Sequence, residues 1–166
     1  FMVTTITEEG YVKFTPAGGW WSQVMLAQQM VITTGDGTEI RGVIGAKAPH
    51  ILTADASSKP VDMKNMYFDL GVDTKEEADK LNIKPGDMVT PFIEYTELSN
   101  KKYLLGKAWD NRVGCAAAIE VMKNLKDVKH ENIYYGVGTV MEEVGLRGAK
   151  TSAFSIQPDI GIALDT

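Results

Sequence analysis

The feature that most limits the possible folds is a change of sequence pattern near residues 99–102. Before it, short runs of alternating apolar and polar residues are separated by turn residues. After it come one helical pattern and two apolar runs. A single layer of structure does not combine the two patterns in this way. We therefore predict a β-rich module over residues 8–98 and an α/β region over residues 99–166.

The β-rich module is predicted from short extended runs joined by turn signals. Glu8-Glu9-Gly10 and Gly35-Asp36-Gly37 are typical of hairpin connections. One helix is predicted over residues 74–83, where Thr74 and Glu77 have the spacing of a capping box. The expected extended segments are 1–7, 11–15, 23–34, 38–45, 48–54 and 66–71, and 88–98 after a turn at Pro85-Gly86-Asp87. Several short strands with one small helix favour a compact barrel or sandwich.

The second region alternates predicted strands and helices. A strand over 103–108 precedes Asp110 and a helix of about 15 residues with its apolar positions on one stripe. A strand over 133–140, a short helical stretch over 149–154 and a strand over 160–164 follow. This order indicates a parallel or mixed sheet with right-handed crossovers. The apolar stripe consists of Cys115, Ala118, Ile119, Met122 and Leu125.

Composition and charge exclude several classes of function. The 166 residues are 44% hydrophobic and 23% charged, which is typical of a globular chain. A net charge of −5 gives no electrostatic basis for binding nucleic acid, and no apolar run approaches the roughly 20 residues of a membrane helix. A single cysteine suits a reducing compartment, so we expect the cytoplasm. Because the chain begins and ends within strand-like runs, we expect it to be a section of a longer protein.

Four carboxylates follow predicted strands. Asp110, the adjacent pair Glu142 and Glu143, and Asp165 each lie at or just past the C-terminal end of one. That edge is where open α/β sheets bind ligands. Such a cluster is strongly self-repelling unless it is partly protonated or binds divalent cations. Taken alone, these residues leave open a solvated acidic loop as well as a metal site.

The glycines near the glutamate pair suggest how a site could be shaped. Gly145 and Gly148 would permit a tight turn and a close approach of backbone after Glu142 and Glu143. If the pair ends a strand, alternation directs one side chain to a metal and the other to a water.

Other reactive or aromatic residues have simpler interpretations. We expect His130 to be exposed in a polar loop and His50 to have a structural or interface role. Cys115 lies on the apolar stripe, so we expect a buried thiol. Trp20 and Trp21 could line a pocket or an oligomer contact, with core packing as the simpler expectation.

Three segments of the second region are "GKAWDNRVG", "TVMEEVGLRGA" and "PDIGIALD". They closely resemble the glutamyl aminopeptidase and tetrahedral aminopeptidase family of di-metal exopeptidases. In the β-rich module, "GVIGAKAPHIL" and "MYFDLGVDTKEEADKLNIKPGD" are similar to the family's inserted domain. The resemblance implies a phosphorylase/hydrolase-like α/β catalytic domain interrupted by a β-rich, barrel-like oligomerisation domain. Residues 1–7 would be a catalytic-domain strand, 8–98 the inserted domain and 99–166 an incomplete catalytic domain.

The resemblance also implies roles for the four carboxylates. Asp110 would bridge two divalent ions, zinc or cobalt, while Glu143 would bind one ion and Asp165 the other. Glu142 would be the general base that deprotonates the attacking water. The implied protein is an aminopeptidase that acts on peptides and forms a homo-oligomer built from dimers, with a dodecamer as one such form.

The family's metal-binding histidines do not match His50 or His130. We therefore expect those ligands outside these residues, and expect the fragment alone to be inactive. Two other functions stay open. The first is an endoglucanase-type glycoside hydrolase, which also uses paired carboxylates. The second is a non-catalytic assembly module built on residues 8–98.

Overall fold

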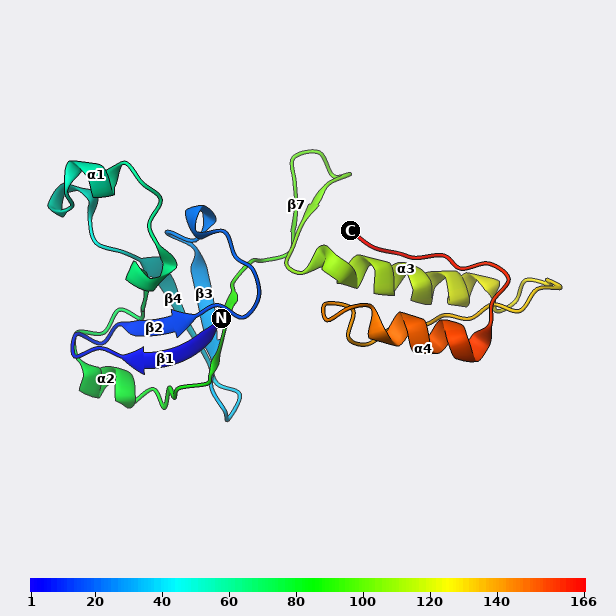
Figure 1. The fold of residues 1–166 in the computed structure, drawn as a ribbon, viewed down its shortest axis with the longest axis horizontal. Coiled ribbons are helices and arrows are strands. Elements are labelled where there is room, and N and C mark those ends of the chain that lie inside the picture. Colours follow the sequence, from blue (N-terminus) through cyan, green and yellow to red (C-terminus); the bar gives the residue numbers. More distant parts are fainter. The chain divides into compact units, whose positions relative to one another are not determined.

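The computed structural model describes residues 1–166, which divide into two compact units, 1–107 and 108–166. Each unit is described by itself (Figure 1). The first contains the strands β1 (Met2–Ile6), β2 (Val12–Thr15), β3 (Gln29–Thr33), β4 (Glu39–Gly45), β5 (Tyr67–Asp69), β6 (Met88–Pro91), β7 (Thr96–Glu97) and β8 (Leu104–Leu105). It also contains the 3₁₀ turns η1 (Ser22–Val24), η2 (Pro49–Ile51) and η3 (Met63–Asn65), and the short helices α1 (Ala54–Ser57) and α2 (Lys75–Asp79).

Six strands of the first unit form a closed barrel in the order β1-β2-β5-β4-β3-β6. Every neighbouring pair is antiparallel, and the pairing of Met2 with Met88 joins β1 to β6 and closes the ring. Closure leaves none of these strands with a free edge. The predicted β-rich barrel is thus confirmed, and residues 2–6 contribute one of its strands.

The barrel interior is filled by side chains rather than left as a channel. Each of the six strands contributes at least one apolar side chain with an exposed fraction of 2% or less, and β3 contributes two, in line with the twofold alternation of strands. These side chains are Val3, Val12, Met30, Ile32, Ile44, Phe68 and Val89. Met25 and Met66 complete the interior from the connecting segments. The core of the chain therefore lies in the first unit.

Local signals at the turns and at α2 have their expected effects. The β1–β2 turn is held by a bond from the Gly10 amide to the Thr7 carbonyl, 3.0 Å. Thr74 Oγ1 accepts a hydrogen bond from the Glu77 amide at 3.3 Å, and so caps α2. The helix is shorter than the predicted range of 74–83, because the chain reaches a left-handed conformation at Asn82, φ 58°.

The extended segment predicted over residues 48–54 is wrong. Pro49 opens the 3₁₀ turn η2, a position that suits its fixed φ and missing amide hydrogen. Thr53 then caps α1 by accepting a hydrogen bond from the Ala56 amide at 3.3 Å. Two helix-start signals close together therefore outweigh the apolar run between them.

The second unit contains α3 (Trp109–Leu125) and α4 (Arg147–Ile156) and no strand. The strands predicted over 133–140 and 160–164 are absent there, and the one predicted over 103–108 is reduced to β8, paired with β7. A strand requires a hydrogen-bonded neighbour, and these two later segments pair neither with each other nor with a third. The α/β sheet expected from the sequence is therefore not formed by residues 108–166.

The second unit also lacks a hydrophobic core. Only Gly114 and Gly148 are buried among residues 108–166. The predicted stripe of α3 is uncovered, with Ile119 and Met122 both exposed. No helix in the structure combines the length and apolar character needed to span a membrane.

Candidate active site

Asp110 lies at the start of α3, immediately before the regular part of the helix. Asp110 (φ −75°, ψ 114°) and Asn111 (φ −114°, ψ 45°) are not helical, so the helical backbone begins at Arg112. The Oδ1 atom of Asn111 accepts a hydrogen bond from the Gly114 amide at 3.0 Å. Asn111 therefore acts as the capping residue, and the exposed Asp110 carboxylate precedes the cap.

Asp165 is connected to this helix start through its neighbour. Asn111 Nδ2 donates a hydrogen bond to the Leu164 carbonyl at 2.7 Å, across 53 residues of sequence. The C-terminal segment runs back beside α3 (Figure 1). The structure thus brings together the backbone segments that carry Asp110 and Asp165. Asp110 does not directly follow a strand end, because β8 ends at Leu105, and Asp165 follows no strand.

Glu142 and Glu143 lie in a compact loop between residues 140 and 148. The Val140 carbonyl accepts from the Gly148 amide at 2.9 Å, and the Glu142 carbonyl accepts from the Gly145 and Leu146 amides, both at 3.0 Å. Both glutamates are exposed. The prediction that this pair ends a strand is wrong for this structure, because residues 133–140 have no strand partner.

The glycines of this loop have the geometry expected of them. Gly145 has a φ of 107°, which side-chain-bearing residues rarely adopt. A Cβ on Gly148 would lie 2.5 Å from both the backbone nitrogen and the backbone oxygen of Val140. Only glycine therefore allows α4 to begin so close to the segment that leads into the acidic loop.

The four carboxylates have the chemistry of a cation site but do not form a complete one here. None of the four salt bridges in the structure includes Asp110, Glu142, Glu143 or Asp165. Exposed carboxylate oxygens without a cationic partner suit divalent ions. However, no three His, Cys, Asp or Glu side chains lie close enough to hold one ion together. The hydrogen bond from Asn111 to Leu164 links the segments that contain Asp110 and Asp165. This bond does not include the loop of Glu142 and Glu143.

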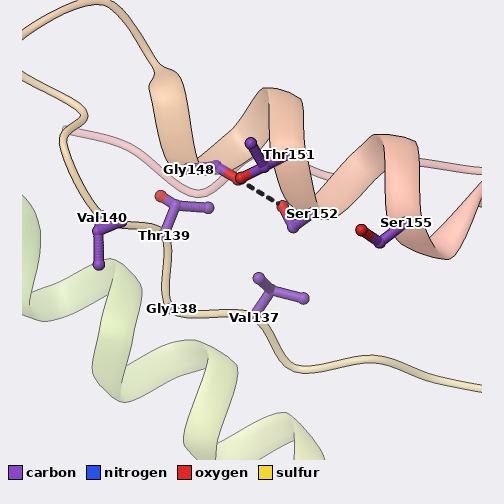
Figure 2. Close-up of a pocket in the computed structure, with 8 residues that line it drawn as sticks. All are labelled: Val137, Gly138, Thr139, Val140, Gly148, Thr151, Ser152 and Ser155. Carbon is purple, nitrogen blue, oxygen red and sulfur yellow. Dashed lines mark hydrogen bonds between the residues drawn. The ribbon is translucent and has the colours of Figure 1, made fainter.

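A cavity of about 300 Å³ lies between residues 137–140 and the first turns of α4 (Figure 2). Hydroxyl groups of Thr139, Thr151, Ser152 and Ser155 line it. The Thr151 and Ser152 hydroxyls both donate to the Gly148 carbonyl, at 3.0 and 2.9 Å. No motif marks these hydroxyl residues in the sequence, and the signal for them is their spacing on one face of a helix.

Several other residues differ from expectation. Cys115 is exposed rather than buried, because nothing covers the stripe of α3. The expectation that Trp20 and Trp21 pack in the core is also wrong, because they are 42% and 65% exposed. Trp20 instead packs against Phe1, with ring centroids 4.8 Å apart, and lines an apolar cavity of about 170 Å³. His130 is exposed, as expected.

The sequence of the chain matches a known protein family. The M42 glutamyl aminopeptidase family matches residues 1–166. The chain therefore belongs to this family, which confirms the resemblance of the motifs around Asp110, Glu142 and Asp165.

Individual relatives agree with this assignment. Glutamyl aminopeptidase of Lactococcus lactis is 34% identical over 166 residues, covering 99% of this chain and 47% of the relative. A TET aminopeptidase structure from Thaumarchaeota archaeon SCGC AB-539-E09 has 41% identity and a TM-score of 0.83, covering 96% of this chain and 45% of that one. The chain thus spans about half the length of the relatives it matches.

Two further solved structures concern assembly and the alternative activity. The Pyrococcus horikoshii TET1 peptidase, which can assemble into a tetrahedron or a large octahedral shell, is 34% identical with a TM-score of 0.69, covering 92% of this chain and 45% of that one. An endoglucanase from Thermotoga maritima is 27% identical with a TM-score of 0.56, covering 75% of this chain and 33% of that one. The endoglucanase is therefore the weaker match.

Proposed function

We propose that the whole protein carrying this chain is a metal-dependent aminopeptidase that removes N-terminal residues from peptides. The observation that carries the proposal is the family match over the full length of residues 1–166. The four carboxylates without cationic partners support it, because each lies in a segment that resembles a family motif.

We assign the metal-binding roles to three carboxylates. Asp110 would hold both of two divalent ions, with Glu143 on one and Asp165 on the other. Such ions, zinc or cobalt, would polarise the scissile carbonyl and lower the pKa of the attacking water. Support within the chain comes from the bond between Asn111 and the Leu164 carbonyl, which joins the segments of Asp110 and Asp165.

Glu142 is the proposed general base. It would take a proton from the attacking water and deliver it to the leaving amine, so that one carboxylate serves both proton transfers. Its exposure and its lack of an ion pair keep the carboxylate free to act. The adjacent Glu143 would bind a metal ion, so its carboxylate would not be free to act as the general base.

The catalytic domain of the whole protein is proposed to contain a phosphorylase/hydrolase-like sheet. Residues 133–140 and 160–164 would be two of its strands, within a domain that includes residues 99–166. Residues 1–7, expected from the resemblance to belong to this domain, instead contribute β1 to the barrel. Apolar side chains in these segments are largely uncovered, with Ile133 at 78%, Ile160 at 81% and Ile162 at 83% exposure. That exposure is costly in water, and strands on both sides would remove it.

Residues 8–98, which contain five of the six barrel strands, are the proposed oligomerisation domain. Trp21 and the apolar cavity beside Trp20 give it surface suited to a contact between copies of the chain. The assembly of the related Pyrococcus horikoshii peptidase supports a homo-oligomer here, built from dimers. Native mass spectrometry of the whole protein tests this, and a strict monomer would contradict it.

Activity is tested with aminoacyl-nitroanilides and the whole protein. We expect release of nitroaniline that a chelator abolishes and added zinc or cobalt restores. Glu142→Gln should lower kcat by about 10²–10⁴-fold, the usual contribution of a general base. Glu131→Gln, an exposed glutamate outside the loop, is the matched control and should leave kcat unchanged. Cleavage that survives chelation would contradict the metal mechanism.

The second candidate function is glycoside hydrolysis, which the endoglucanase structure alone favours. Assay of the same preparation on cellulose separates the two activities. Sugar release without nitroaniline release would favour the hydrolase. For the 166-residue chain by itself, the proposed role is assembly without catalysis, because residues 108–166 do not form a complete metal site.

A further inference from the structure

We infer that Asn111 is a positioning residue that holds the two metal-binding aspartates, Asp110 and Asp165, in a fixed relation. The inference rests on the proposed function for the identity of the metal ligands. It adds a residue whose side chain would contact neither metal nor substrate.

The geometry of the Asn111 carboxamide carries the inference. Its two ends bind different parts of the chain: Oδ1 accepts from the Gly114 amide at 3.0 Å, and Nδ2 donates to the Leu164 carbonyl at 2.7 Å. The first bond fixes the side chain at the start of α3. The second fastens the segment that ends at Asp165 to the same point.

No other hydrogen bond to the rest of the second unit holds this C-terminal segment. Residues 158–166 have no strand partner, and the only other bond within them runs from the Thr166 amide to Asp165 Oδ1, 3.0 Å. Asp110 is the neighbour of Asn111 on one side of the link, and Asp165 is the neighbour of Leu164 on the other. Within residues 108–166, one side-chain bond therefore joins the backbone segments of two aspartates that are 55 positions apart in the sequence (165 minus 110).

Gly114 provides the space that this arrangement needs. A Cβ at Gly114 would collide with the Oδ1, Cγ and Nδ2 atoms of Asn111. Gly114 is also one of the two buried residues of the second unit. Glycine lowers helix stability relative to alanine, so its presence in the first turn of α3 fits a requirement to seat the Asn111 side chain.

A purely structural explanation is that Asn111 only caps α3. The two roles separate because serine is as good a capping residue as asparagine but is too short to reach the Leu164 carbonyl as well. Asn111→Ser should keep the cap and lose the link, whereas Asn111→Ala should lose both. Asn124→Ser, at an exposed position of the same helix, is the matched control.

The test measures Co²⁺ binding to the metal-free whole protein by calorimetry and by the visible absorption of bound cobalt. We expect Asn111→Ser to weaken Co²⁺ binding by about 10–100-fold, as loss of a residue that orients a ligand does, while the melting temperature stays unchanged. Asn111→Ala should weaken binding similarly and also lower the melting temperature. Gly114→Ala should weaken binding although Asn111 is intact, and Asn124→Ser should change neither quantity.

The carbonyl ¹³C resonance of Leu164 in the metal-free protein gives a readout that does not depend on metal. It should shift in Asn111→Ser, because the Nδ2 donor is lost, and stay in place in Asn124→Ser. Unchanged Co²⁺ affinity or an unchanged Leu164 resonance in Asn111→Ser overturns the positioning role. An unaltered protein that neither binds Co²⁺ nor cleaves aminoacyl-nitroanilides contradicts the proposed function instead, so the two failures are distinguishable.

Discussion

At the scale of single residues, one added methyl group at Gly148 should disturb the loop of Glu142 and Glu143. An added Cβ would meet the Val140 backbone at 2.5 Å, and backbone atoms cannot move aside as a flexible side chain can. We expect Gly148→Ala to displace the loop of Glu142 and Glu143 and to cost about 1–3 kcal/mol of stability, as overpacking usually does. The proposed aminopeptidase activity of the whole protein should fall with it, by an amount that steady-state kinetics would measure.

Gly138→Ala is the control for this prediction, because a Cβ there would have no atom within 4 Å. The two substitutions add the same methyl group at two glycines that line the same cavity. Equal melting temperatures and equal activities for the two variants would show that the close approach of α4 to Val140 has no role in placing the loop.

Residue identities were more predictable from the sequence than residue environments were. The need for glycine at 145 and 148 followed from the turn that must come after the glutamate pair. The burial of Cys115 and Trp20 was predicted wrongly, because burial depends on what covers a side chain. The role of Asn111 is not predictable from the sequence for a similar reason. It depends on a hydrogen bond to Leu164, which is distant in the sequence.

At the scale of elements, the turn between β3 and β4 has a titratable group that makes its stability depend on pH. Asp36 accepts a hydrogen bond from the Thr34 hydroxyl at 2.6 Å and another from the Thr38 amide at 3.1 Å. These bonds lower the pKa of Asp36 from 3.8 to about 2, with the Thr34 hydroxyl as the largest cause. Because the pKa is lower in the folded state, the turn stabilises the fold above pH 3.8 and loses that contribution as the pH falls through about 2.

Asp36→Asn should therefore flatten the loss of melting temperature between pH 4 and pH 2, since an amide does not titrate. Thr34→Val removes the main hydrogen-bond donor to Asp36 and should reduce this loss of melting temperature in part. Melting curves of the 166-residue chain between pH 4 and pH 2 measure both effects. Melting temperatures at pH 6–7 give the change in stability of each variant that does not depend on pH. The same steep acid dependence in all three proteins would contradict this account of the turn.

Elements were predictable where local chemistry decides them. The hairpin signals before β2 and β4, and the Thr74 cap of α2, lie within a few residues of the groups they bond. The segments 133–140 and 160–164 are different, because an apolar run becomes a strand only when a neighbour supplies the hydrogen bonds. In the barrel those neighbours are present, and in residues 108–166 they are not.

At the scale of the whole molecule, the two units differ in what holds them. The barrel is closed and has a continuous apolar core, so its strands have both backbone partners and burial. Residues 108–166 contain two helices and two extended segments but bury only Gly114 and Gly148. The second unit therefore depends on contacts that its own residues do not supply, which agrees with a chain about half as long as its relatives.

This difference predicts two patterns of hydrogen–deuterium exchange. In the 166-residue chain, amides of β3 and β4 should exchange slowly, and those of 133–140 and 160–164 rapidly, because they lack backbone acceptors. In the whole protein, a sheet that contains both segments should slow their exchange to the range of the barrel strands. β3 serves as the internal standard, since its partners β4 and β6 are present in both proteins. If 133–140 exchanged equally fast in both proteins, the segment would not be a strand of the proposed catalytic sheet.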